Sequence, residues 1–302
     1  MKGRINKSCF LYVLIKNTLQ LLRIRGIIQI NTLRIRSVLK GNEKVKNLIR
    51  MKFTKDTLIA VISGASMIFL SLLMIPFSGN SFGEVIISFI LRDILMIFGL
   101  GVLFISLYID KKGKEVLIDI GFSKKKLVLS IVLDCIFALG LLAMFMKDGI
   151  PNNIFNKYNI YAASYIITAG IFEMTFIYGF LRMSFEKAFG IIPAIILTSG
   201  FYSFHHAVFQ PEFLHLFLVG LMYCSVFYIT HNILIIFPLF WGIGALWDVI
   251  ISSEAGEGIK NFESFVFAVI IWFLIVIWFI FRSIRRKKNA VQNIDSNNGN
   301  AD

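Results

Sequence analysis

The chain after residue 57 alternates between long apolar runs and short polar segments that contain most of its Lys, Arg, Asn and Gly residues. Several of these runs reach the roughly 20 residues that an α-helix needs to cross about 30 Å of hydrocarbon. The pattern therefore predicts an all-α fold, a polytopic transmembrane helical bundle of about eight spans. We place the spans at residues 58–77, 85–109, 127–146, 160–181, 188–209, 213–230, 232–250 and 264–281.

Lysine and arginine residues near the predicted span ends alternate between rich and poor loops. Loop 110–126 contains six lysines, loop 78–84 contains no basic residue, and a cluster of five basic residues follows the last span. Basic loops stay on the cytoplasmic side of a membrane. We therefore predict that both termini are cytoplasmic and that the chain is a multi-pass protein of the cell membrane.

The N-terminal segment 1–57 differs from the rest because it carries fourteen Lys or Arg residues against two acids, Glu43 and Asp56. Two interpretations stay open: a basic cytoplasmic segment that lies on anionic lipid, or sequence upstream of a true start at Met51. The remaining chain divides, in order, into three N-terminal transmembrane helices (58–159), a core (160–250), the last loop and transmembrane helix (251–281), and a tail that is basic and then disordered (282–302).

The composition agrees with a membrane protein, since 57% of the residues are hydrophobic and only 16% are charged. A soluble fold cannot bury that much apolar surface. The net charge of +13 comes from loops and termini, so membrane orientation explains it better than a nucleic-acid partner does. The cysteines Cys9, Cys135 and Cys224 have no CxxC spacing and support neither a disulfide framework nor a zinc–thiolate site.

Ionisable side chains at membrane depth are few, and each costs roughly 2.5 to 3.5 kcal/mol on insertion scales, so each needs a partner or a function. They are Arg92, Asp93, Asp134, Glu173, His205, His206, His215 and Asp248. For Arg92 and Asp93 we expect separate structural contacts, because neighbouring residues on a helix point about 100° apart. For Asp134 and Asp248, which lie toward span ends, we expect contact with water at the membrane face.

Glu173 differs from these residues because it lies near the middle of its span, with no Lys or Arg before Arg182. It needs a partner from another helix, and His205 and His206 are the nearest candidates by depth. A carboxylate that faces an imidazole is a general base beside a metal ligand or an oxyanion donor. The same pair is equally consistent with a proton relay or a structural ion pair.

Two short motifs in the core resemble those of a known membrane family. Residues 173–179 read Glu-Met-Thr-Phe-Ile-Tyr-Gly, and residues 201–205 in the next span read Phe-Tyr-Ser-Phe-His. They resemble the CAAX protease and bacteriocin-processing (CPBP, or Abi) family of intramembrane metalloproteases. That family carries Glu-Glu-x-x-x-Arg-Gly in one span, Phe-x-x-x-His in the next and His-x-x-x-Asn or Asp in a third region, and the resemblance covers residues 160–250.

The resemblance implies peptide-bond hydrolysis in membrane-near or prenylated peptides, with a peptide or membrane protein and the lipid bilayer as partners. Glu173 then activates the attacking water, and His205 assists it, with Phe201 one turn earlier on the same face. A divalent metal such as zinc is the implied cofactor, with His205 and His206 as its ligands. Supporting site residues under this hypothesis are His206, Tyr178, Phe201 and Asp248.

The sequence departs from the family pattern at three positions. Met174 stands in place of the second Glu, Tyr178 stands in place of the Arg, and the third region has no His in residues 240–244. A catalytically inactive member that acts in bacteriocin self-immunity or cell-envelope regulation is therefore an alternative. A proton-coupled transporter, with Asp93, Asp134, Glu173 and the two histidines as a relay, is a further alternative.

Overall fold

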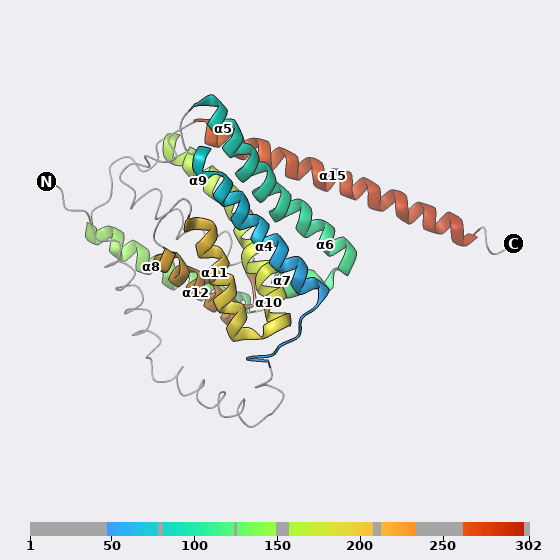
Figure 1. Ribbon diagram of the computed structural model, residues 1–302, viewed down its shortest axis with the longest axis horizontal. Helices are drawn as coiled ribbons and strands as arrows, with labels where there is room; N and C mark the ends of the chain where they lie inside the picture. The colour runs from blue at the N-terminus through green and yellow to red at the C-terminus, as the bar shows by residue number, and fades with distance from the viewer. Residues whose placement is uncertain are drawn as a thin grey trace, which may run out of the picture.

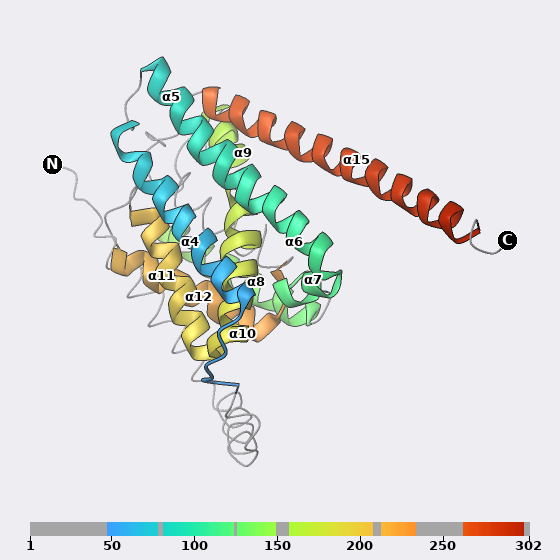
Figure 2. The ribbon, with the colours of Figure 1, turned by 45° about the vertical axis from the view of Figure 1, so that its right-hand side comes forward.

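The computed structural model describes residues 47–77, 81–123, 126–148, 157–207, 213–233 and 262–298. These residues form helices and their connections, without any strand, which confirms the all-α prediction. Most of the helices pack side by side in a bundle, whereas the C-terminal helix α15 (Phe262–Asn298) runs obliquely past it and projects away at its far end (Figures 1 and 2).

The helices before α15 follow one another with short connections. In chain order they are α4 (Lys55–Leu73), the 3₁₀ turn η1 (Ile75–Phe77), α5 (Phe82–Ser88), the π-helix η2 (Phe89–Phe104), α6 (Ile105–Lys112), α7 (Glu115–Ile120), α8 (Leu127–Asp148), α9 (Lys157–Phe172), the π-helix η3 (Glu173–Leu181), α10 (Arg182–Phe189), α11 (Ile191–Ala207) and α12 (Phe213–Thr230). Two of the rods are composite, because α5, η2 and α6 are continuous, as are α9, η3 and α10.

Among the described residues, five helices are long and apolar enough to cross a membrane. They are Lys55–Leu73, Phe82–Lys112, Lys157–Phe189, Phe213–Thr230 and Phe262–Arg286, and each coincides with a predicted span. The helices α8 and α11 occupy two further predicted spans, whereas the span predicted at 232–250 lies almost entirely outside the described residues. The chain is a membrane protein, while the span count and the cytoplasmic termini stay predictions.

The starts of α4 and α5 are fixed by hydroxyl side chains. The Thr54 Oγ1 accepts a hydrogen bond from the Thr57 amide at 3.3 Å, and the Thr57 Oγ1 accepts one from the Thr54 amide at 3.1 Å, which fixes the first turn of α4. Ser81 and Glu84 form the same reciprocal arrangement at the start of α5. Such capping boxes satisfy amide groups that a helix leaves unpaired at its first turn.

The helix η3 is held in the centre of the bundle by close packing against η2. A Cβ added at Gly101 of η2 would lie 2.9 Å from the Phe172 Cα, so only glycine permits this approach of the two backbones. The Thr175 hydroxyl donates to the Gly101 carbonyl at 2.8 Å at the same crossing. Phe176 and Phe180 of η3 are fully buried against Phe104 in edge-to-face contacts. These contacts fix the rotation of η3.

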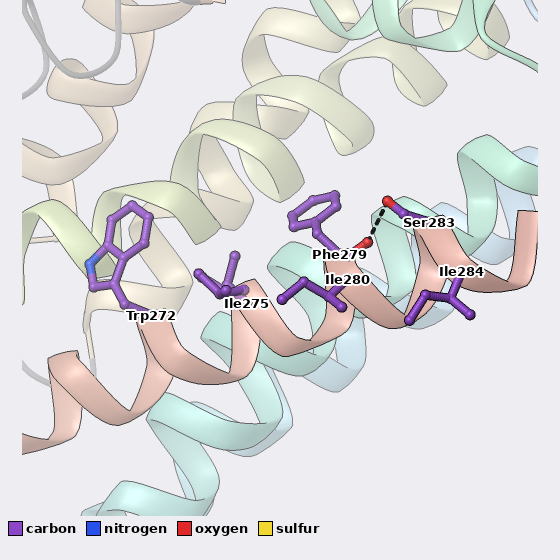
Figure 3. A pocket seen from close by; sticks show the side chains of 7 residues that line it. Trp272, Ile275, Phe279, Ile280, Ser283 and Ile284 are labelled. Atoms are coloured by element: carbon purple, nitrogen blue, oxygen red, sulfur yellow. Dashed lines mark hydrogen bonds between the residues drawn. The ribbon is translucent and has the colours of Figure 1, made fainter. Parts of the chain in front are cut away.

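The helix α15 packs on α9 and η2, and two of its tryptophans form hydrogen bonds to α9 and α6. The Trp272 indole N–H donates to the Thr168 hydroxyl at 3.0 Å, and the Trp278 indole N–H donates to the Ser106 hydroxyl at 2.8 Å. A shallow apolar hollow lies along this helix (Figure 3). The side chains that line it all come from α15: Trp272, Ile275, Val276, Phe279, Ile280, Ser283 and Ile284. The hollow is therefore separate from the core around η3.

The described chain begins with a short segment, a turn at residues 47–49 and irregular backbone up to residue 54, which forms hydrogen bonds with the corner between α10 and α11. The Arg50 amide donates to the Phe189 carbonyl at 2.9 Å, and the Ile192 amide donates to the Leu48 carbonyl at 3.1 Å. The corner turns at Gly190, whose φ of +90° and contact with the Leu48 carbonyl exclude a side chain. Residues upstream of Met51 thus contact the bundle.

Candidate active site

The site is centred on Glu173, the first residue of the π-helix η3. Its side chain is buried in the bundle, and the residue lies in the middle of the continuous helix Lys157–Phe189 and of a predicted span. π-helical turns are rare and frequently occur at functional sites, because their wider turn changes the direction of the side chains that follow. A carboxylate at this depth is costly unless it is paired.

The carboxylate of Glu173 is paired with His206 of α11. The Glu173 Oε1 lies 3.2 Å from the His206 Nε2. The other ring nitrogen of His206, Nδ1, lies 3.2 Å from the Tyr202 carbonyl, which can only accept a hydrogen bond. Both ring nitrogens of His206 therefore face oxygen atoms, and the contact with Glu173 is an ion pair only when His206 is protonated.

His205 lies beside this pair but is directed toward a different helix. Its Nδ1 is 2.7 Å from the hydroxyl of Ser71 on α4, and its ring meets Phe172 edge to face. The two histidine rings are 4.8 Å apart between centroids. His206 thus lies next to both Glu173 and His205. The contact with the Glu173 carboxylate is made by His206, since adjacent residues on α11 point in different directions.

Tyr178 lies five residues after Glu173 and is almost fully buried. In an α-helix such residues would diverge by about 140°, whereas the wider turn of a π-helix brings them closer to one face. The Tyr178 ring packs against Tyr202, whose ring in turn contacts His206. Among the described residues, the Tyr178 hydroxyl has no hydrogen-bond partner.

The other two predicted supporting residues have different outcomes. Phe201 packs away from the pair, against Phe185 of α10 at 5.4 Å between ring centroids and against Gly64 of α4. It therefore fixes the position of α11 and contributes packing rather than a polar group. Asp248 lies outside the described residues, so its predicted role stays a prediction.

The described donors do not by themselves form a metal site. No three His, Cys, Asp or Glu side chains in the described ranges gather closely enough to hold an ion. The His206 nitrogens face Glu173 and Tyr202, and the His205 Nδ1 faces Ser71. A structural zinc site needs four ligands and a catalytic one usually three. That His205 and His206 bind zinc stays a prediction.

Two residues at this site were missed by sequence reasoning. Ser71 is a small polar residue in an apolar run and carried no recognisable signal. Arg182 was noted only as the first basic residue after Glu173, yet its guanidinium is almost fully buried at the end of η3. It donates to the carbonyls of Tyr178, Asp119 and Ile120, pairs with Glu186 at 2.7 Å, and lies 3.7 Å over the ring of Phe227.

A second polar cluster, formed by Arg92, Asp93 and Tyr165, corrects the expectation for the first two residues. Arg92 and Asp93 were expected to have separate contacts, but their side chains pair at 2.9 Å because the long arginine reaches around the helix. Both also contact Tyr165 of α9, whose hydroxyl donates to Asp93 at 3.1 Å while Arg92 lies over its ring.

The expectation for Asp134 is also corrected. We expected this residue to contact water at the membrane face, but it is only 5% exposed and lies on α8, which packs against α12.

Comparison with known proteins matches the part of the chain that contains the pair. Residues 156–250 match the model of a family described as type II CAAX prenyl endopeptidase Rce1-like. By this match the segment is similar to the CAAX protease (CPBP) family. It includes α9, η3, α10, α11 and α12, and so Glu173, His205 and His206, whereas Ser71 precedes it. No curated protein and no solved structure matches the chain.

Proposed function

We propose that this protein is a CAAX-type intramembrane endopeptidase of the cell membrane that hydrolyses membrane-near or prenylated peptides. The observation that carries the proposal is the 3.2 Å contact between the buried Glu173 carboxylate and the His206 imidazole, which lies inside the segment that matches the CAAX prenyl endopeptidase family model. A buried carboxylate held by an imidazole is suited to general acid–base chemistry, because small changes around it move its proton.

In the proposed reaction His206 is protonated and Glu173 is ionised. Glu173 accepts a proton from a water molecule while the water oxygen forms a bond to the peptide carbonyl carbon. The carbonyl electrons move onto oxygen, and a nearby imidazolium stabilises that oxyanion strongly because the site excludes bulk water. Glu173 then delivers its proton to the peptide nitrogen, the C–N bond breaks, and a carboxylic acid and an amine leave.

The proposal is tested by hydrolysis of an internally quenched prenylated peptide by purified protein in liposomes. Glu173→Gln keeps the size of the side chain but removes the base, so we expect the rate to fall by about 100-fold or more. The matched control is Glu115→Gln at the exposed start of α7, which should keep the full rate. Full activity of Glu173→Gln would reject the mechanism, and metal analysis of the same protein tests the predicted zinc.

A catalytically inactive member that acts in bacteriocin self-immunity or envelope regulation is the second candidate. The observation that favours it is the burial of Met174 and Tyr178 at the positions of the family's second Glu and its Arg. Under this alternative the wild type and Glu173→Gln would bind a prenylated peptide equally and neither would cleave it. Cleavage that depends on Glu173 would reject this alternative.

A further inference from the structure

Ser71 of α4 makes a contact with the site that neither the motifs nor the family comparison assigns. Its hydroxyl is fully buried and lies 2.7 Å from the Nδ1 of His205, although the two residues are 134 positions apart. It precedes the segment that matches the CPBP family. The contact therefore connects the first described helix to the candidate active site.

The other acceptors around Ser71 favour one position for the proton on this hydrogen bond. The Ser71 hydroxyl also lies 3.1 Å from the Met67 carbonyl, one turn earlier on α4, and 3.8 Å from the Met96 sulfur, and a carbonyl can only accept. A serine has one hydroxyl proton, so its donation to Met67 leaves the Ser71 oxygen as an acceptor toward His205. In this arrangement the proton between them lies on His205, whose Nδ1–H donates to Ser71.

Packing on the same face of α4 keeps this contact in register. Gly64 lies seven residues before Ser71, about two turns, so both residues face α11. A Cβ at Gly64 would lie 2.6 Å from the ring of Phe201, one turn before His205, so the two helices are in close contact there. The position of the Ser71 hydroxyl relative to the His205 ring is thus set by backbone packing, and the ring cannot turn without losing the bond.

We propose that Ser71 is a positioning residue that holds His205 as the Nδ1–H tautomer, with the lone pair on Nε2. A neutral imidazole fixed in this form presents an acceptor to the site, and the hydrogen bond at one ring nitrogen decides the role of the other. The use of that lone pair in hydrolysis, as an acceptor for water or the leaving amine, rests on the proposed function. The tautomer itself does not.

Nitrogen-15 NMR of protein labelled at histidine, in lipid nanodiscs, measures the tautomer directly. The chain has four histidines, and His205→Gln identifies the His205 signals. We expect wild-type His205 to show a protonated Nδ1 and an unprotonated Nε2, and Ser71→Ala to move both shifts toward a mixture of tautomers. Unchanged His205 shifts in Ser71→Ala, or a protonated Nε2 in the wild type, would overturn the proposal.

The matched control is Ser63→Ala on the same helix. Ser63 is also buried and also donates to a carbonyl of its own helix, that of Ala60, at 3.2 Å. This variant should leave the His205 shifts unchanged. It thereby distinguishes the loss of the Ser71–His205 contact from a general effect of removing a buried hydroxyl group from α4. A shift as large in Ser63→Ala as in Ser71→Ala would overturn the proposal.

Peptide hydrolysis then separates this inference from the proposed function. In Ser71→Ala we expect kcat to fall by about 10- to 100-fold with KM unchanged, as for other partners that orient a functional histidine. In the His205→Gln background Ser71→Ala should have no further effect, because the residue acts through His205. If the wild type does not cleave at all, the proposed function fails while the NMR result still decides the role of Ser71.

Discussion

The chemistry of the candidate site depends on His206 at the scale of single residues, because its two ring nitrogens join Glu173 to the Tyr202 carbonyl. In His206→Gln the imidazole proton is lost and a buried carboxylate has no cationic partner. We expect kcat for peptide hydrolysis to fall by about 100-fold. His215→Gln near the start of α12 is the matched control and should retain the wild-type rate. Equal rates in His206→Gln and the wild type would exclude the pair from the reaction.

The hydroxyl of Tyr178 gives a second prediction at this scale. A buried hydroxyl without a described partner carries a desolvation cost, and a hydroxyl that reaches the substrate can donate to a developing oxyanion. We expect Tyr178→Phe to keep or raise the wild-type melting temperature and to lower kcat by about tenfold. The control is Tyr158→Phe at the exposed start of α9, which should change neither quantity. An unchanged kcat in Tyr178→Phe would leave Tyr178 as packing alone.

The participants of the site could be predicted from the sequence, but their pairing could not. Glu173 and the two histidines were recognisable because ionisable groups at membrane depth need partners. Which histidine meets Glu173 depends on the rotation of α11, and this rotation is set by distant packing such as Phe201 against Gly64. The contact of Ser71 with His205 was not predicted for the same reason, because an isolated serine in a sequence does not indicate which residue of another helix it contacts.

The element that positions Glu173 is the π-helix η3, and the buried side chain of Arg182 follows its last residue, at the start of α10. This side chain satisfies the Tyr178 carbonyl and two carbonyls at the end of α7, and it pairs with Glu186. Hydropathy predicted a helix across this region but not its π turns, because apolar composition does not distinguish one pattern of backbone hydrogen bonds from another. The π turns of η3 are therefore seen in the structure and not in the hydropathy pattern.

Arg182→Met should therefore destabilise the bundle strongly. The variant keeps the apolar stem but removes the guanidinium donor of three carbonyls and leaves Glu186 with the Tyr228 hydroxyl as its described donor, so we expect the free energy of unfolding to fall by about 3 kcal/mol. Lys187→Met is the matched control, since its ion pair with Asp119 is exposed and should contribute less than about 1 kcal/mol. Reversible unfolding in mixed micelles measures both. Equal effects of the two substitutions would contradict a structural role for Arg182.

At the scale of the whole molecule, hydropathy predicted most of the architecture because the bilayer requires long apolar helices. The five described helices that can cross a membrane all lie at predicted spans. The segment before α4 was not predicted to pack on the bundle, because a few residues without a periodic pattern give no signal in sequence. Most of its contacts are backbone hydrogen bonds to the corner of α10 and α11, and such bonds do not depend on the side chain.

This segment makes the two interpretations of the N-terminus experimentally distinct. A chain that begins at Met51 loses the bonds of Asn47, Leu48 and Arg50, including the Arg50 guanidinium contacts with the Glu186 carbonyl at 2.6 and 3.1 Å. Each such bond contributes about 1 kcal/mol, so we expect a melting temperature several degrees below that of the full chain. A chain that begins at Val45, behind an added Met, retains these bonds and should melt with the full chain. Equal melting of all three would mean that the segment does not stabilise the corner. A low value for the Met51 chain alone would mean that residues 47–50 belong to the folded bundle.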